Sequence, residues 1–441
     1  MSTLGTATLI AAITFSVALM VARFGVHRRV SIVGAIFVTA TIQYAVLAVP
    51  YGLGMVGADQ LQVPLSDDFP WFIAATFVSF AVGAWAASSL FRFDLAKEHA
   101  RFFQAPVEGG TSQPDRVVFL ALLVPTLLVG VLYVTSAGRT GIEALMADAR
   151  DPRMLKQFRT DFAGANPYAY SGTLVNNLFA PILLLTALNV GRATGRLMWR
   201  ATALCLFILL VFTSTAALNK APIALVFLLL ILNWYFSQEP GKGRRVWILA
   251  LALVMSVGLV MGGYYVTYDV ARGEALEATF TRLMIIPLVC VQGFLYVYPS
   301  IIDFNYGLGV GLVARIAGVT DYVSPPVAVG EIISGRNVCA DAIWSTELWA
   351  AFGYPGVIIG GFLVGAGLVW ADRHCLSKPR GPTSVALYAF MVVTGVRLPE
   401  FSIFTALLSG GLGLAIPLVT LLEGFLFRHP VDQPGRIPAR R

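Results

Sequence analysis

The chain has 441 residues, of which 57% are hydrophobic and 12% are charged, and its net charge is +7. Soluble domains have about 25% charged residues, so this composition excludes a soluble protein and an appended soluble domain. The positive charge follows the membrane topology and does not indicate nucleic-acid binding. The cysteines have neither metal-binding nor redox spacing, and we expect no disulfide among Cys205, Cys290, Cys339 and Cys375.

Apolar runs of about 18 to 25 residues recur along the chain, and each is long enough to cross a hydrocarbon core of about 30 Å. The sequence therefore predicts an all-α polytopic integral membrane protein with a single domain over residues 1–441. No basic segment precedes the first run, which we expect to be retained as a span. Eleven full spans are predicted near residues 4–22, 30–50, 70–91, 117–136, 172–190, 201–217, 221–236, 246–265, 354–370, 383–396 and 402–427.

Short basic connections mark the cytoplasmic side of such a protein. They place the N-terminus outside and the C-terminus inside, and they lie near residues 23–29, 92–116, 192–200, 242–245 and 373–380 and in the tail. All four histidines fall in these connections or in the tail. A general base on the outer side would therefore have to be a carboxylate.

One apolar piece, from Leu283 to Pro299, does not fit this alternation. The basic clusters on either side of this piece are both cytoplasmic, so the chain must cross the membrane an even number of times between them. Two other apolar runs already supply these crossings. Pro287 and Gln292 suit a re-entrant or interfacial helix packed against protein. The alternative is one half of an uncounted pair of spans, which gives about 11 to 12 transmembrane helices in all.

Two large outer loops, residues 137–171 and 267–342, are unusually rich in cations for translocated segments. The planar guanidinium group of arginine and the ammonium group of lysine both bind the oxygens of a pyrophosphate group well. In the first loop the cations recur at helical spacing, so a solvated amphipathic helix is the alternative. The basic residues are Arg139, Arg150, Arg153, Lys156, Arg159, Arg272, Arg282, Arg315 and Arg336.

The segment Gly330–Gly356 concentrates polar residues just before an apolar span. The pattern predicts a helix from Ala340, with one face that carries Trp344, Glu347, Leu348 and Ala351. Gly353, Pro355 and Gly356 interrupt it. The functional interpretation is a carboxylate held near the membrane surface, with Arg336, Asn337 and Asp341 just before it. The alternative is a set of interfacial residues with a tryptophan anchor.

Three smaller features also carry charge on the predicted outer side. Arg397 and Glu400 lie in the turn between the last two spans, either as an interfacial ion pair or as a phosphate site. Lys220, in another turn, either binds a ligand or caps a helix C-terminus. The Asp67–Asp68 pair in the first outer loop either activates an acceptor or is a solvated loop.

Several of these segments together resemble one family. They are the arginine-rich loop 139–159, the turn 214–220, the segment Tyr268-Asp-Val-Ala-Arg272, the stretch 307–361 with STELWAAFGYPGVIIGG, and Arg397. In this layout the chain is similar to the Wzy-type polymerases, which join O-antigen or exopolysaccharide repeat units at the bacterial inner membrane. The resemblance covers about two thirds of the chain.

The resemblance implies a class C glycosyltransferase-like fold with its active site facing the periplasm. It implies transfer of a growing glycan from undecaprenyl pyrophosphate to a second lipid-linked repeat unit, with inversion and without metal, nucleotide or other cofactor. A chain-length regulator is an implied partner, beside the lipid bilayer. Glu347 is expected as the base, with Arg336 and Arg397 also catalytic. The pyrophosphate would be held by Arg272, Arg336, Arg397, Lys220 and Arg159, and the sugars by Tyr268, Asn337, Asp341, Trp344 and Glu400.

Three other functions remain open on the sequence. The related O-antigen ligases rely on an outer histidine, which this chain lacks in the predicted topology. A transferase that uses a polyprenyl-phosphate sugar would place its base at Asp67 or Asp68. A polysaccharide or lipid transporter would need internal repeats and polar residues at mid-span depth, and the charges gather instead in the outer loops.

Overall fold

Helices form every regular element of the chain wherever the structure, a computed structural model, describes it. It describes residues 1–56, 63–106, 114–136, 143, 158, 162, 166–216, 220–238, 258, 272–309, 311–319, 322–335, 340, 343–400, 403–407 and 410–426. Only the backbone is described for residues 114–118, 220–223, 272–275, 311–312, 315 and 422–426.

Eight helical stretches in the described ranges are long and apolar enough to cross a membrane, so the chain is a multi-pass membrane protein. Seven of them confirm predicted spans: Thr3–Phe24, Ile32–Gly52, Phe69–Leu90, Ala169–Thr194, Leu197–Ala216, Ser345–Ser377 and Ile403–Leu421. The eighth is Leu276–Val297. Two expected spans appear as shorter apolar helices, Phe119–Thr135 and Ala224–Ser237. The span expected at 246–265 lies almost wholly outside the described residues.

The stretch Leu276–Val297 differs from the expectation of a partial helix beginning at Leu283. It is 22 residues long and therefore long enough for a full span. Three elements build it without a break in the chain: α14 (Arg272–Phe280), the π-helical η4 (Thr281–Ile285) and α15 (Ile286–Val297). The polar residues near its start, Glu277 and Arg282, concealed its length in the sequence.

The helices divide between two compact units. The first unit contains residues 1–104, 254–378 and 391–412, and the second contains 105–253, 379–390 and 413–441. The remaining elements of the first unit are α1 (Thr3–Phe24), α2 (Ile32–Ala40), the π-helical η1 (Thr41–Ala45), α3 (Ala48–Gly52), α4 (Phe69–Leu90), α5 (Leu95–Gln104), α16 (Gly311–Ile316), α17 (Pro325–Ser334), α18 (Ser345–Ser377), the 3-10 turn η5 (Leu398–Glu400) and α20 (Ile403–Leu407).

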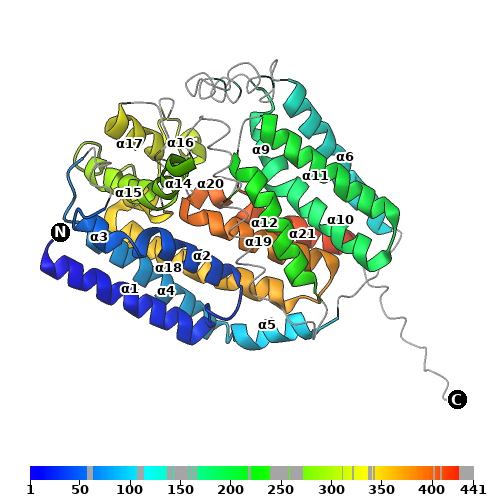
Figure 1. Cartoon of the computed structure of the whole chain (residues 1–441), viewed down its shortest axis with the longest axis horizontal. Helices are drawn as coiled ribbons and strands as arrows, with labels where there is room; N and C mark the ends of the chain where they lie inside the picture. Colours follow the sequence, from blue (N-terminus) through cyan, green and yellow to red (C-terminus); the bar gives the residue numbers. More distant parts are fainter. Residues whose placement is uncertain are drawn as a thin grey trace. The chain divides into compact units, whose positions relative to one another are not determined.

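In the first unit, α1, α4 and the long α18 run side by side, with α4 between the other two (Figure 1). Glycines allow α4 and α18 to approach closely. A Cβ on Gly83 would lie 2.1 Å from the carbonyl oxygen of Phe362, and one on Gly365 would lie 2.2 Å from that of Phe80. Gly361 and Gly365 form a small-xxx-small pattern, which brings backbones together in membrane helix pairs.

A buried carboxylate fixes the start of α2. The two oxygens of Asp372, on α18, accept hydrogen bonds at 2.9 Å from the backbone N–H groups of Ile32 and Val33. Asp372 is fully buried. Its negative charge faces the positive end of the helix dipole, which stabilises both partners.

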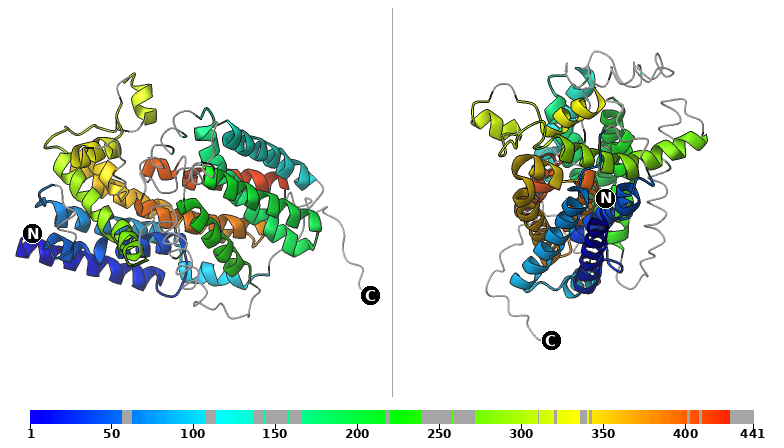
Figure 2. Two further views of the ribbon diagram at one scale, coloured as in Figure 1. Left: turned by 45° about the horizontal axis from the view of Figure 1, so that its top comes forward. Right: turned by 90° about the vertical axis from the view of Figure 1, so that its left-hand side faces the viewer.

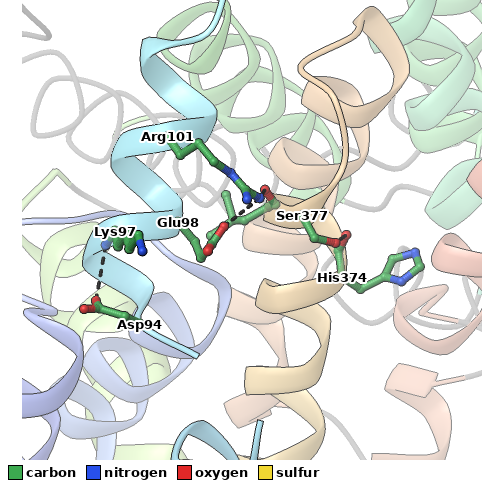
Figure 3. Close-up of polar contacts among 7 residues, drawn as sticks. Asp94, Lys97, Glu98, Arg101, His374 and Ser377 are labelled. Atoms are coloured by element: carbon green, nitrogen blue, oxygen red, sulfur yellow. Dashed lines mark hydrogen bonds and ion pairs between the residues drawn. The ribbon is translucent and has the colours of Figure 1, made fainter. Parts of the chain in front are cut away.

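The amphipathic helix α5 contacts the last turns of α18 (Figure 3). Asp94 caps it by accepting hydrogen bonds from the backbone N–H groups of Ala96 and Lys97. The guanidinium of Arg101 bonds the carboxylate of Glu98 at 2.6 Å and donates to the carbonyl of Leu376 at 3.2 Å. An amphipathic helix of this kind suits a membrane surface.

The second unit contains α6 (Pro114–Thr135), α9 (Ala169–Leu174), the π-helical η3 (Val175–Phe179), α10 (Ala180–Thr194), α11 (Leu197–Ala216), α12 (Lys220–Ser237) and most of α21 (Leu412–Leu426). The first part of α19 (Pro382–Arg397) also belongs to it. Helices α6, α11 and α10 lie side by side in Figures 1 and 2.

Buried polar groups hold the second unit together. Asn189 and Asn233 exchange two amide hydrogen bonds of 2.9 Å, and Asn189 also donates to the carbonyl of Pro382. Arg380, 2% exposed, donates to the carbonyls of Ala105, Phe236 and Gln238 at 2.7 to 2.8 Å. Satisfied polar groups of this kind act as glue between membrane helices.

Candidate functional site

The carboxylate of Glu347 lies in the first turn of α18. The helix begins at Ser345, so the prediction of a start at Ala340 was wrong by about one turn. The start is anchored to α4 by a hydrogen bond of 2.9 Å between the hydroxyls of Thr76 and Ser345. A carboxylate in the first turn is stabilised in its ionised form by the helix dipole, as a general base requires.

Helix α18 is interrupted at Gly353, as the sequence predicted. The φ of Gly353 is +62° and its ψ is −145°, a conformation that essentially only glycine adopts. A Cβ at this position would also lie 3.1 Å from the ring of Phe304. Pro355 follows two residues later and has no N–H to continue the helix ladder.

A loop of the same unit satisfies the backbone groups that the break releases. The N–H of Asn305 donates to the carbonyl of Ala350 at 3.0 Å, and that of Tyr306 donates to the carbonyl of Ala351 at 3.1 Å. Irregular backbone at membrane depth is tolerated only where protein or a cavity receives it. The break is therefore an integral part of the structure.

Aromatic rings fix the two halves of α18 relative to each other. Trp349 lies before the break and Tyr354 after it. The ring of Trp349 packs edge-on against that of Tyr354, with ring centres 4.9 Å apart, and against that of Phe304, at 6.1 Å. The indole N–H of Trp349 donates to the carbonyl of Tyr298 at 3.1 Å. Burial raises the pKa of the Tyr298 phenol, which stays neutral. Sequence reasoning missed Trp349, because two of its partners, Phe304 and Tyr298, lie 45 and 51 residues away along the chain.

A small hollow of about 30 Å³ adjoins Glu347, with room for roughly one or two water molecules. It is lined by the loop that contains Asn305, Gly307 and Gly309, by the start of α17, by the first half of α18 and by Phe404 of α20. Two of its lining rings are exposed, Phe352 by 46% and Phe404 by 36%. The ring of Tyr306, which is 73% exposed, packs against that of Phe352 at 6.4 Å. Glu347 thus lies beside a small, mostly apolar hollow with exposed aromatic rings near its edge.

A second polar cluster joins Arg397 and Glu400. Arg397 ends α19, and Glu400 in η5 lies close enough to interact with its charge. The amide of Gln43, in the π-helical η1, donates to the Glu400 carboxylate at 2.5 Å, and the hydroxyl of Tyr44 donates to the carbonyl of Pro399 at 2.7 Å. Single-turn π segments are frequent at functional sites. A lone glutamine within an apolar run gave no sequence signal for this contact.

Trp344 does not lie where a sugar could reach it. Its side chain is 2% exposed, and its ring packs against that of Phe80 at 5.4 Å. This burial argues against the expected substrate contact. The exposed rings of Tyr306, Phe352 and Phe404 are better placed for such a role.

The other predicted site residues have no described side chain. Arg272 and Lys220 begin α14 and α12, of which only the backbone is described there, and Lys220 belongs to the second unit. The remaining five predicted residues lie outside the described residues: Arg159, Tyr268, Arg336, Asn337 and Asp341. Most of loop 137–171 and part of loop 267–342 lie there too.

Within the described ranges, no three His, Cys, Asp or Glu side chains gather as a metal site. Comparison with known proteins gives no relative: no family model, no curated protein and no solved structure matches this chain.

Proposed function

We propose that this protein is a membrane glycosyltransferase that polymerises lipid-linked oligosaccharide repeat units into O-antigen or exopolysaccharide. Its donor and acceptor are undecaprenyl-pyrophosphate-linked repeat units at the periplasmic face of the bacterial inner membrane. The observation that carries the proposal is Glu347, a first-turn carboxylate of an interrupted membrane helix beside a small hollow edged by exposed aromatic rings. The resemblance of the surrounding segment to the Wzy-type polymerases adds to it.

In the reaction, the bond between the anomeric carbon of the donor glycan and the pyrophosphate oxygen breaks. The acceptor hydroxyl oxygen forms the new bond to that carbon from the opposite side, which inverts its configuration. Glu347 takes the proton of the hydroxyl, and undecaprenyl pyrophosphate leaves. General-base help of this kind contributes about 10² to 10⁴ in rate.

The hollow is too small for a sugar ring, since it holds about 30 Å³. The acceptor hydroxyl would meet Glu347 at the mouth of the hollow, while the sugar stacks on the exposed rings of Tyr306 and Phe352. Aromatic rings combine large contact area with little loss of conformational entropy. An interfacial aromatic belt is the competing explanation for these rings.

Arginines neutralise the leaving pyrophosphate in this proposal, which is the largest electrostatic demand of the reaction. Glu400 lies close enough to interact with the charge of Arg397, and the amide of Gln43 donates a hydrogen bond to Glu400. Arg336, Arg272, Arg159 and Lys220 complete the proposed set on the basis of the sequence. Arg336→Ala is expected to weaken donor binding and turnover together, and a wild-type response would remove Arg336 from the site.

The test is a reaction with purified protein in nanodiscs and the lipid-linked repeat unit encoded in the same gene neighbourhood. We expect a ladder of products on a gel without added metal or nucleotide. A single addition to a different acceptor would instead indicate a ligase or another transferase. Complete lack of reaction with a verified donor would favour transport.

A further inference from the structure

A second, larger hollow lies on the other side of the break in α18, within the first unit. It is a groove of about 630 Å³ between α1, α4 and the second half of α18. Its lining residues are Thr8, Ala12, Asp68, Trp71, Ala74, Ala75, Val78 and Tyr354. None of these residues belongs to the proposed Glu347 site.

The groove is polar at one end and apolar along its length. From Trp71 to Val78 it follows α4 for roughly 10 Å, at 1.5 Å per residue. The floor there consists of alanines and a valine, whose small side chains leave space for a hydrocarbon chain. Trp71, 40% exposed, marks the membrane surface, where tryptophan rings gather. The apolar floor therefore runs from the surface into the bilayer.

The polar end is built to receive a cation with N–H donors. The hydroxyl of Tyr354 donates to Oδ1 of Asp68 at 3.0 Å and fixes this exposed carboxylate at the groove mouth. Asp67, also exposed, adds a second negative charge next to it. Trp71 and Tyr354 supply aromatic faces, which attract ammonium groups. An anionic head group would meet two carboxylates there.

We propose that this groove binds a bilayer phospholipid with a primary ammonium head group, of the ethanolamine class. The ammonium bonds Asp68 between the rings of Trp71 and Tyr354, and one acyl chain follows Ala75 and Val78 into the bilayer. The proposal does not depend on the transfer reaction, because it concerns a different hollow with different residues. It gives the first unit a fixed lipid contact beside the interrupted helix.

The experiment is native mass spectrometry of the delipidated full-length protein with phosphatidylethanolamine or phosphatidylglycerol of identical acyl chains. We expect phosphatidylethanolamine to bind about fivefold more tightly, which corresponds to about 1 kcal/mol. Asp68→Asn is expected to abolish this preference, whereas Asp67→Asn, its neighbour outside the groove lining, is expected to retain most of it. Equal binding of the two lipids, or an unchanged preference in Asp68→Asn, would overturn the proposal.

A second pair of variants tests the apolar floor. Ala75→Leu fills the groove and is expected to lower phosphatidylethanolamine binding at least threefold. Ala86→Leu adds the same volume to α4 at a half-buried position outside the groove and is expected to bind normally. If both variants bind as the wild type does, the lipid lies elsewhere. The melting temperature of each variant shows whether it is folded, independently of lipid binding.

Discussion

The backbone N–H of Asn305 donates a hydrogen bond of 3.0 Å to the carbonyl of Ala350, in the last turn before α18 is interrupted. This contact joins residues that are 45 positions apart in the sequence. It ties the loop beside Glu347 to the break at Gly353. The conformation of Gly353 and the shape of the proposed site are therefore linked.

Gly353→Ala tests this link. Alanine would have to adopt a conformation with φ of +62° and place its Cβ 3.1 Å from the Phe304 ring. We expect a loss of about 1 to 3 kcal/mol in stability and a large loss of activity. The measurements are the melting temperature and the rate of polymer formation. Gly367→Ala, on the same helix, is the control, because a Cβ at this position would meet nothing within 4 Å. An active, fully stable Gly353→Ala would contradict the account.

Gln43→Leu removes the amide that bonds the Glu400 carboxylate. The change leaves a half-buried carboxylate without that donor, at a cost of about 1 kcal/mol. If the Arg397–Glu400 pair holds pyrophosphate, binding of undecaprenyl pyrophosphate should fall by about tenfold in a direct binding assay. Gln104→Leu, at an exposed position of the same unit, should leave it unchanged. Normal binding by Gln43→Leu would remove this cluster from the proposed site.

Tyr306→Ala tests the aromatic rim. Loss of a sugar-stacking ring should raise the KM for the acceptor severalfold and leave the melting temperature nearly unchanged, because Tyr306 is 73% exposed. Ile359→Ala, 61% exposed on α18, is the control for loss of an exposed apolar side chain. The idea of a stacking rim fails if the two variants have the same KM as the wild type.

Arg380→Gln tests a structural arginine. The buried guanidinium satisfies three carbonyls, and each such charged hydrogen bond contributes about 1.5 to 3 kcal/mol. We expect poor expression and a markedly lower melting temperature. Arg373→Gln should cost less than 1 kcal/mol, since this exposed arginine makes a single cation–π contact with Phe91. Equal stability of the two variants would argue against the role of Arg380.

The sequence predicted the helical fold, most spans and the interruption of α18, because apolar runs and the Gly353-Tyr-Pro-Gly356 pattern are local signals. It did not predict contacts between distant residues such as Gln43 and Glu400, or Tyr354 and Asp68. In the sequence, Arg380 is one of several cations that mark the cytoplasmic side. In the structure, its hydrogen bonds join separate segments of the second unit. Charge patterns report topology, whereas packing decides which charges are buried.

Trp344 shows the same limit for aromatic residues. Its position on the predicted face with Glu347 suggested a substrate contact, but the helix begins one turn later than expected and the ring packs inside the unit. Phe352, which is exposed beside Glu347, and Tyr306, which packs against Phe352, come from two segments that the sequence does not connect.

The most direct test of the central claim is a comparison of Glu347→Gln with the wild-type protein in the polymerisation reaction, with donor binding measured in parallel. We predict that Glu347→Gln binds the lipid-linked donor normally but forms polymer at least 100-fold more slowly, since only the general base is lost. Glu277→Gln, an exposed glutamate on α14, should form polymer at the wild-type rate. Polymer formation by Glu347→Gln at the wild-type rate would contradict the account.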